Sequence, residues 1–419
     1  MSSPNRTEEL SLLRDVPFVL LLIGRFLAVM SSVAAPVAIA FGVLESPDGT
    51  PTRLSVIMAC QAVPLIAFVL IGGVIADRMP RNRVVLIGLT LSTISFGMIG
   101  LMLLDGRAPW WFLGVAAVAS GIGIAVMNPA LAAIVPELVN KEQLHAANSF
   151  VGIIRNTARI LGVIIAGFLV SLFGGGWSLI IFALCFLVAG TIFGFVRLRY
   201  PNQRTGDSTS FITDLRTGWS EFTRQEWLWV VVLQSSLHFA CYSAALSVIG
   251  PALASAELGG AQPWSWLLAC QSTGTLIGAV LAMRWKPRRT ILAGVLTTAA
   301  TMPLSFVLLG LNAPIPLVMV AMVLTGIGMS LLAVLWATTV QTLVPKESLS
   351  RVSSYDSLGS MLMSPIALML AGPAVVLLGE RNAMLACGIL LIGITTISLV
   401  SRDVRTVTLT RTRDMDKTA

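Results

Sequence analysis

Charged residues are scarce in this chain. Asp, Glu, Lys and Arg make up 11% of its 419 residues, against about 25% in an ordinary soluble domain. Hydrophobic residues make up 56% and the mean hydropathy is +0.86, which is more apolar surface than a soluble domain of this length could bury. The composition therefore excludes a soluble enzyme. It predicts an all-α membrane protein, because a helix satisfies its own backbone polar groups in lipid.

Residues that bind metals, nucleotides or redox partners are also few. The chain has two histidines and five cysteines, and the cysteines lie in apolar runs without C-x-x-C spacing. No G-x-x-x-x-G-K-[ST] sequence occurs, so nothing supports ATP hydrolysis. We therefore expect no metal, no cofactor and no catalytic residues. The net charge of +8 comes from residues in short gaps between apolar runs, which favours anionic lipids over nucleic acid as partners.

Twelve apolar runs are long enough to cross a bilayer, which takes about 20 helical residues. The runs are 17–43, 54–75, 84–104, 110–135, 149–172, 177–196, 227–253, 264–283, 290–311, 314–340, 354–378 and 382–400. With both termini in the cytoplasm, 22 of the 28 Lys and Arg residues lie on the cytoplasmic side, and only Arg53, Arg107 and Arg381 lie outside. This asymmetry follows the positive-inside rule. We therefore expect a multi-pass protein of the bacterial inner membrane with cytoplasmic termini.

The two halves of the chain repeat each other at an offset of 205 residues. The repeated pairs are Gly121-Ile122-Gly123 with Gly326-Ile327-Gly328, Lys141-Glu142 with Lys346-Glu347, Ala166-Gly167 with Ala371-Gly372, and Gly73 with Gly278. Parallel six-helix repeats around a central site are typical of secondary transporters. We expect an N-terminal bundle (1–196), a cytoplasmic linker with an amphipathic helix (197–226), a C-terminal bundle (227–400) and a cytoplasmic tail (401–419).

The gap between the second and third runs carries the most specific motif, Gly73-Val74-Ile75-Ala76-Asp77-Arg78-Met79-Pro80-Arg81-Asn82-Arg83. It resembles the loop signature G-x-L-A-D-R-x-G-R-R of the major facilitator superfamily. The resemblance covers nearly the whole chain and implies twelve transmembrane helices as two six-helix pseudo-repeats. In that family the acid matching Asp77 contacts the start of helix 11 and keeps the cytoplasmic side closed. The resemblance therefore implies gating roles, which fall here on Gly73, Asp77, Arg78, Arg81, Arg83 and Asp356.

One departure from the signature points to a branch of the family. Pro80 stands where the general pattern has glycine, and this is similar to enterobactin-type siderophore exporters and drug:proton antiporters. The segments 155–159 and 351–356 resemble that branch too. The arginine that antiporters carry in helix 4 would be Ala117 here, and their helix 5 signature survives only as Gly162, Val163 and Gly167. The route of coupling protons therefore stays open.

Three arginines, Arg25, Arg155 and Arg159, lie inside apolar runs. An ionisable group there costs about 2.5 kcal/mol or more, so each is a functional candidate. Arg155 and Arg159 share a helix face through their i, i+4 spacing, and no acid lies well inside any run. Either helix ends, backbone carbonyls and Asp356 satisfy these cations, or an anionic ligand does. Arg25, nearer the end of its run, could instead snorkel to the surface.

Uncharged polar residues complete the predicted substrate site. They are Gln61, Gln234, His238, Tyr242 and Gln271. Gln234, His238 and Tyr242 share a helix face. His238 has an ordinary pKa near 6.5 that suits proton exchange, although a lone membrane histidine is more commonly a hydrogen-bonded packing element.

Taken together, these features predict a monomeric secondary active transporter, with a small-molecule substrate, protons and membrane lipids as its partners. The predicted activity is proton-coupled efflux of small amphiphilic drugs, siderophores or secondary metabolites by alternating access. Two alternatives stay open from the sequence. One is an importer or uniporter of a small organic anion, and the other is a non-transporting membrane receptor on a transporter scaffold.

Overall fold

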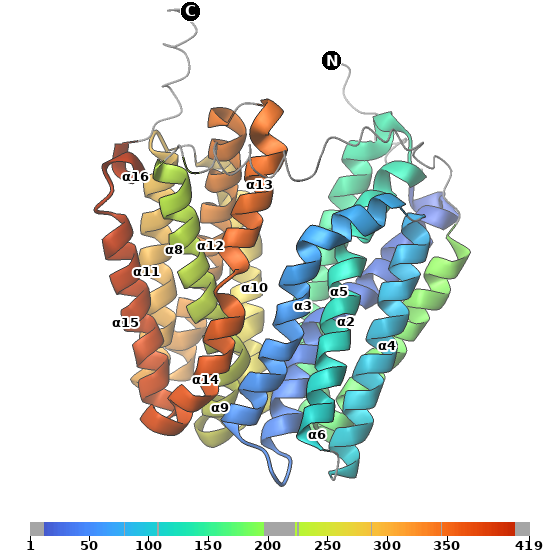
Figure 1. The fold of residues 1–419 in the computed structure, drawn as a ribbon, viewed down its shortest axis with the longest axis horizontal. Helices are drawn as coiled ribbons and strands as arrows, with labels where there is room; N and C mark the ends of the chain where they lie inside the picture. Colours follow the sequence, from blue (N-terminus) through green and yellow to red (C-terminus); the bar gives the residue numbers. More distant parts are fainter. Residues whose placement is uncertain are drawn as a thin grey trace, which may run out of the picture. The chain divides into compact units, whose positions relative to one another are not determined.

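A computed structural model describes residues 12–78, 80–106, 109–196, 223, 226–285, 287–344 and 346–406, with the backbone alone for 69–78, 141, 346–351 and 354. All regular structure in these ranges is helical, as the sequence predicted (Figure 1). The long helices are α2 (Val16–Leu44), α3 (Pro51–Arg78), α4 (Arg81–Asp105), α5 (Trp110–Leu138), α6 (Leu144–Phe195), α8 (Glu226–Ala244), α10 (Ala261–Arg284), α11 (Thr290–Gly310), α12 (Ile315–Leu343), α13 (Lys346–Met361), α14 (Ser364–Leu378) and α15 (Glu380–Ser398). Short elements are η1 (Leu12–Arg14), η2 (Lys141–Gln143), the π-helical turns η3 (Ala245–Ile249) and η4 (Ala254–Leu258), α9 (Gly250–Leu253) and α16 (Arg402–Thr406).

Eleven helical segments in the described ranges are long and apolar enough to cross a membrane. One of them, α6, has 52 residues. A straight helix of that length would extend about 78 Å, more than twice the hydrocarbon thickness of a bilayer. Gly174 divides it, with φ 75° and ψ 168° inside the helix, a conformation that glycine adopts without a steric penalty. The chain therefore crosses the membrane twice in α6, and the count of twelve spans is confirmed.

The eleventh span is broken, which the sequence analysis did not predict. The run 354–378 was expected to form one helix, but α13 ends at Met361 and α14 begins at Ser364. Pro365, the second residue of α14, has no backbone N–H and cannot donate to the carbonyl of residue 361. Helix seven is also irregular, because η3, α9 and η4 follow α8 in place of a continuous α-helix.

Contacts divide the chain into two compact units. Unit 1 comprises Met1–Gly206 and Ala254–Ser265, and unit 2 comprises Asp207–Leu253 and Trp266–Ala419. In unit 1, α2 packs along α6, α4 packs against α5 and α6, and α3 packs against α5. In unit 2, α11 packs against α12 and α15, while α8 packs against α13, α14 and α15. The predicted linker, residues 197–226, lies almost wholly outside the described residues, so its amphipathic helix stays a prediction.

The repeat seen in the sequence reappears in the packing of each unit. A Cβ atom at Gly121 of α5 would overlap the backbone carbonyl of Gln61 in α3. A Cβ atom at Gly326 of α12 would likewise overlap the carbonyl of Gln271 in α10. The second and fourth helices of each half therefore approach most closely at the same glycine, which only a residue without a side chain permits.

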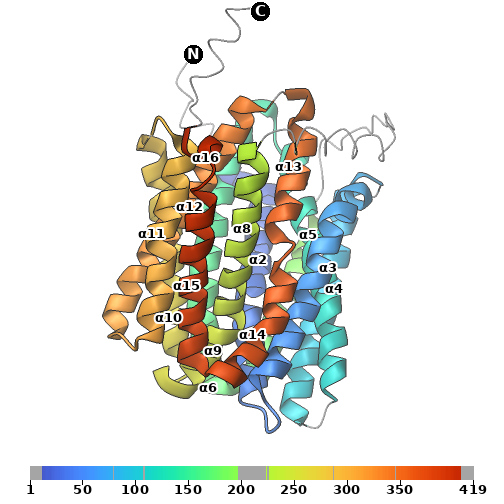
Figure 2. The ribbon, with the colours of Figure 1, turned by 60° about the vertical axis from the view of Figure 1, so that its left-hand side comes forward.

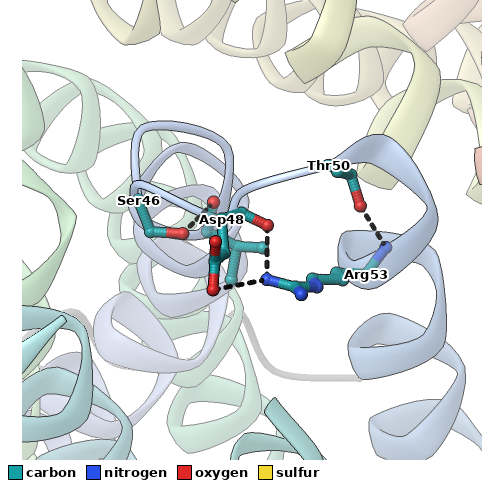
Figure 3. A network of polar contacts seen from close by, with 5 residues as sticks. Ser46, Asp48, Thr50 and Arg53 are labelled. Carbon is teal, nitrogen blue, oxygen red and sulfur yellow. Dashed lines mark hydrogen bonds and ion pairs between the residues drawn. The ribbon is translucent and has the colours of Figure 1, made fainter. Parts of the chain in front are cut away.

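The connection between α2 and α3 is held by its own polar groups (Figure 3). Arg53 Nη1 lies 3.4 Å from Asp48 Oδ2 and donates to the Asp48 carbonyl at 2.5 Å. The Arg53 amide donates to Thr50 Oγ1 at 3.2 Å. This basic residue, one of the few assigned to the outer side, is thus neutralised within its own turn.

Candidate functional site

Arg81, in the motif between α3 and α4, forms a buried ion pair with Glu137 of α5. Arg81 Nη1 lies 3.0 Å from Glu137 Oε1, and the two side chains are 20% and 8% exposed. Arg81 also donates to the Ala133 carbonyl at 2.6 Å. The start of α4 is therefore fixed to the end of α5 by a charge-assisted contact.

Glu137 was missed by the sequence analysis. The predicted run ended at residue 135, but α5 continues to Leu138 and buries the carboxylate in its last turn. A signal was present, because Glu137 lies two residues beyond the run and on the same side of the membrane as the basic motif. The predicted run stopped before Glu137 because a carboxylate lowers the hydropathy, but in the fold Arg81 neutralises this carboxylate.

Of the other motif residues predicted to act in gating, the structure describes the side chain of Arg83 alone. Gly73, Asp77 and Arg78 lie in the last turns of α3, but their side chains lie outside the described residues. Arg83 is exposed near the start of α4. The gating role of Asp77 therefore remains a prediction.

Arg25 of α2 is buried within unit 1, with 7% of its surface exposed. Its Nη1 donates to the Leu131 carbonyl of α5 at 2.9 Å, so the side chain is anchored inside the bundle and does not snorkel. Its Nε has no hydrogen-bond partner, and no carboxylate pairs with it among the side chains that the structure describes. A buried cation without a countercharge is costly, which makes this position attractive to an anion.

Arg155 adds a second positive charge on α6, the helix that packs along α2, which carries Arg25. Arg155 and Arg159 are both exposed, one helical turn apart. The three arginines predicted as a substrate site thus belong to α2 and α6, which pack together in unit 1.

Two of the predicted glutamines, Gln61 and Gln271, join neighbouring helices, one in each unit. Gln61 Nε2 donates to Ser120 Oγ of α5 at 2.9 Å. Gln271 Nε2 donates to the Tyr242 hydroxyl and contacts Met329 Sδ at 3.5 Å. Each glutamine therefore uses its carboxamide to tie the second helix of its half to other spans.

Residues of the predicted face formed by Gln234, His238 and Tyr242 bond to two different helices, α15 and α10. His238 is 8% exposed, and its Nε2 lies 3.0 Å from Thr395 Oγ1 of α15. Its Nδ1 lies 2.9 Å from the Gln234 carbonyl oxygen. Tyr242 instead bonds to Gln271 of α10. The imidazole is therefore a bridge between α8 and α15 with both ring nitrogens occupied.

Asp356 is a half-buried carboxylate on α13, about 15 Å along the helix from Lys346 at the usual rise per residue. Trp336 Nε1 donates to its Oδ2 at 2.8 Å, and Ser360 Oγ lies 3.4 Å from its Oδ1. The Trp336 ring packs edge-on against Trp227 at 5.7 Å. Within the described part of the chain no cation pairs with this carboxylate.

This chain is similar in sequence and in structure to membrane transporters. The sequence profile of the Major Facilitator Superfamily matches residues 21–259 and 235–415. The multidrug efflux pump Tap of Mycolicibacterium fortuitum is 25% identical over 403 residues, which are 91% of this chain and 95% of that protein. The staphyloferrin A transporter of Staphylococcus aureus is 27% identical over 137 residues, 32% of this chain and 34% of that protein.

Solved structures share the fold at low sequence identity. The nucleoside transporter NupG superposes with a TM-score of 0.74 at 12% identity, covering 92% of this chain and 98% of that one. A bacterial homolog of the human lysosomal transporter Spinster gives 0.72 at 14% identity, covering 92% and 97%. Because the family profile matches both halves of the chain and the fold agrees, this chain belongs to the Major Facilitator Superfamily and is a multi-pass membrane transporter related to drug-efflux pumps, not an enzyme.

Proposed function

We propose that this protein exports small amphiphilic compounds, such as drugs, siderophores or secondary metabolites, in exchange for protons. It works as a monomer in the bacterial inner membrane, with both termini in the cytoplasm, and opens alternately to either side. The observation that carries this proposal is a pair of charged groups without an opposite charge among the described side chains, Arg25 buried in α2 of unit 1 and Asp356 in the first turn of the eleventh span in unit 2. Two relatives, a multidrug efflux pump and a staphyloferrin A transporter, support the substrate class.

Arg25 and Arg155 provide the binding site for an anionic group of the substrate. Arg25 cannot rehydrate at 7% exposure, and an anion beside its guanidinium supplies the countercharge that the described side chains do not. Arg155 and Arg159 are exposed and offer the first contact, whereas buried Arg25 offers the stronger one. An amphiphile with a carboxylate, phosphate or sulfonate matches this combination of charge and apolar surroundings.

Asp356 carries the coupling proton in this proposal. A carboxylate held by an indole N–H and a hydroxyl, without a described cation, changes the charge of its span whenever it gains or loses a proton. It lies just before the break between α13 and α14, where a change in charge can bias the geometry of helix eleven. The ion pair of Arg81 with Glu137 holds the end of the 73–83 motif, which carries the predicted gating residues, against α5.

Accumulation of two matched dyes in intact cells tests the proposal. 8-Anilinonaphthalene-1-sulfonate is an amphiphilic anion, and N-phenyl-1-naphthylamine is the same skeleton without the sulfonate. Cells expressing the protein should accumulate less of either dye, and a protonophore should remove the difference. Arg25→Gln, which keeps a donor for Leu131, should impair export of the anion at least tenfold more than export of the neutral dye.

The control substitution is Arg53→Gln, which removes a charge from the outer turn and should leave both dyes unaffected. Equal impairment of the two dyes by Arg25→Gln would make Arg25 a structural residue. Higher accumulation in expressing cells would replace export by import of a small organic anion.

A further inference from the structure

Unit 2 contains an apolar groove between α8 and α15, and it is lined in part by Gln234, one of the residues predicted from the sequence to contact substrate. The groove has a volume of about 660 Å³, within the range of small-molecule sites. Helices α8 and α15 contact each other and lie side by side in Figure 2. Its walls are formed by Trp229, Leu233, Leu237, Ile394 and Ile397.

The rim of this groove faces acyl chains. Leu233 is 51% exposed, Ile397 is 73% exposed and Trp229 is 41% exposed, all on membrane-spanning helices. Apolar side chains that a membrane bundle leaves exposed to this degree are solvated by lipid. A ligand would therefore reach the groove from within the bilayer.

One polar group in the groove is left without a partner. Gln234 lines the groove and is 5% exposed, yet its Oε1 makes no hydrogen bond within the described part of the chain. A buried amide that is not hydrogen-bonded costs about 1 to 3 kcal/mol. The terminal torsion of a glutamine is broad, so the buried oxygen can turn toward the groove and accept a hydrogen bond from a ligand donor.

The mouth of the groove is polar. Ser401 Oγ donates to Glu226 Oε1 at 2.9 Å, and Arg402 lies beside them at the start of α16. Gln234 lies eight residues further along α8 than Glu226, about 12 Å deeper at the helical rise. The groove thus offers hydrogen-bonding groups at two depths with an apolar wall between them.

We propose that this groove binds a drug-sized amphiphile taken directly from the lipid leaflet, with a hydroxyl or amine of the ligand bonded to Gln234 and its apolar body against Leu237 and Ile394. This inference rests on the proposed function, because it provides a membrane-side binding site for the same substrate class. A phospholipid acyl chain fits less well, since it has no group that would satisfy the Gln234 carboxamide. The groove has a volume that suits a small molecule, and Gln234 lies deep within it. These two features together favour a drug-sized amphiphile.

Photolabelling of the full-length protein in bilayer nanodiscs tests this site. The probe is 4-(hydroxymethyl)benzophenone, and its matched control is 4-(methoxymethyl)benzophenone, which has no hydrogen to donate. Labelling by the alcohol should map to residues of α8 and α15 that line the groove. Gln234→Leu should weaken labelling by the alcohol about tenfold, equivalent to about 1.4 kcal/mol, and leave labelling by the ether unchanged.

Two further variants keep the test informative if Gln234→Leu folds poorly. Leu237→Trp fills the groove and should reduce labelling by both probes. Ile389→Trp adds the same bulk at a position on α15 that is 65% exposed and outside the groove, and it should reduce neither.

Four results would overturn the inference. The first is labelling spread evenly over lipid-exposed residues, and the second is equal labelling of wild type and Gln234→Leu by the alcohol. The third is loss of labelling when phosphatidylglycerol is added to phosphatidylcholine discs. The fourth is a gain of labelling when residues 407–419 are removed. The third result would assign the groove to a phospholipid, and the fourth would assign it to the tail of this chain. Specific labelling without dye export would instead refute the proposed function and leave the groove standing.

Discussion

The ion pair between Arg81 and Glu137 makes an asymmetric prediction about stability. Glu137 is 8% exposed and Arg81 is 20% exposed, so the carboxylate is the partner less able to recover water. Arg81→Leu leaves that carboxylate buried without its cation, and the expected cost is about 3 to 5 kcal/mol. Glu137→Leu leaves Arg81 with the Ala133 carbonyl, and the loss of one charged hydrogen bond costs about 1.5 to 3 kcal/mol.

The double variant Arg81→Leu/Glu137→Leu should be close to wild type in stability, because an apolar pair often replaces a buried ion pair without loss. The expected coupling energy is therefore at least about 4.5 kcal/mol, which is more than about 1,000-fold in the unfolding equilibrium. Unfolding in detergent can be followed with a thiol-reactive fluorescent dye, since the five cysteines are free and half-buried or buried. Additive losses in the double variant, or a cost below about 1 kcal/mol for Arg81→Leu, would refute this reasoning.

Other substitutions give sharp expectations in the same unfolding assay. Gly121→Ala should cost about 1 to 3 kcal/mol by forcing α5 away from α3, whereas Gly152→Ala, which meets nothing within 4 Å, should be neutral or stabilising; equal effects would contradict the close approach. Gly174→Ala should cost about 1 to 3 kcal/mol because φ is 75° and ψ is 168° there, a combination that essentially only glycine adopts, and an unchanged midpoint would mean that the turn has another conformation. His238→Phe and Thr395→Val should each cost about 1 to 3 kcal/mol, with the double variant less destabilised than the sum, because each single change leaves a buried polar partner; strict additivity would show that the bridge is not formed.

The number and positions of the spans were largely predictable because a bilayer imposes a length on every span. Runs of about 20 apolar residues can only be helices that cross lipid, and the positions of Lys and Arg fix the count. The same constraint placed the turn between residues 172 and 177, where Gly174 divides α6. The break between α13 and α14 was not predicted, because the segment from 354 to 378 was expected to form one span although Pro365 lies inside it.

Side-chain partners were predictable only where they are local. The i, i+4 spacing placed Gln234, His238 and Tyr242 on one face, but which helix each one meets depends on how α8 packs against α15 and α10. Glu137 was missed because its neutraliser, Arg81, lies on another helix. The anchoring of Arg25 to the Leu131 carbonyl is likewise a tertiary contact that no local pattern contains.

Proton movement by the purified protein in liposomes tests the central claim most directly. A gradient of 8-anilinonaphthalene-1-sulfonate should drive protons in the opposite direction, reported by a pH-sensitive dye in the lumen. Asp356→Asn should abolish this proton flux while exchange of labelled for unlabelled substrate continues, and Asp48→Asn in the outer turn should behave as wild type. Undiminished proton flux in Asp356→Asn would contradict the assignment of the coupling carboxylate, and binding of substrate without any flux in the wild type would make the protein a receptor.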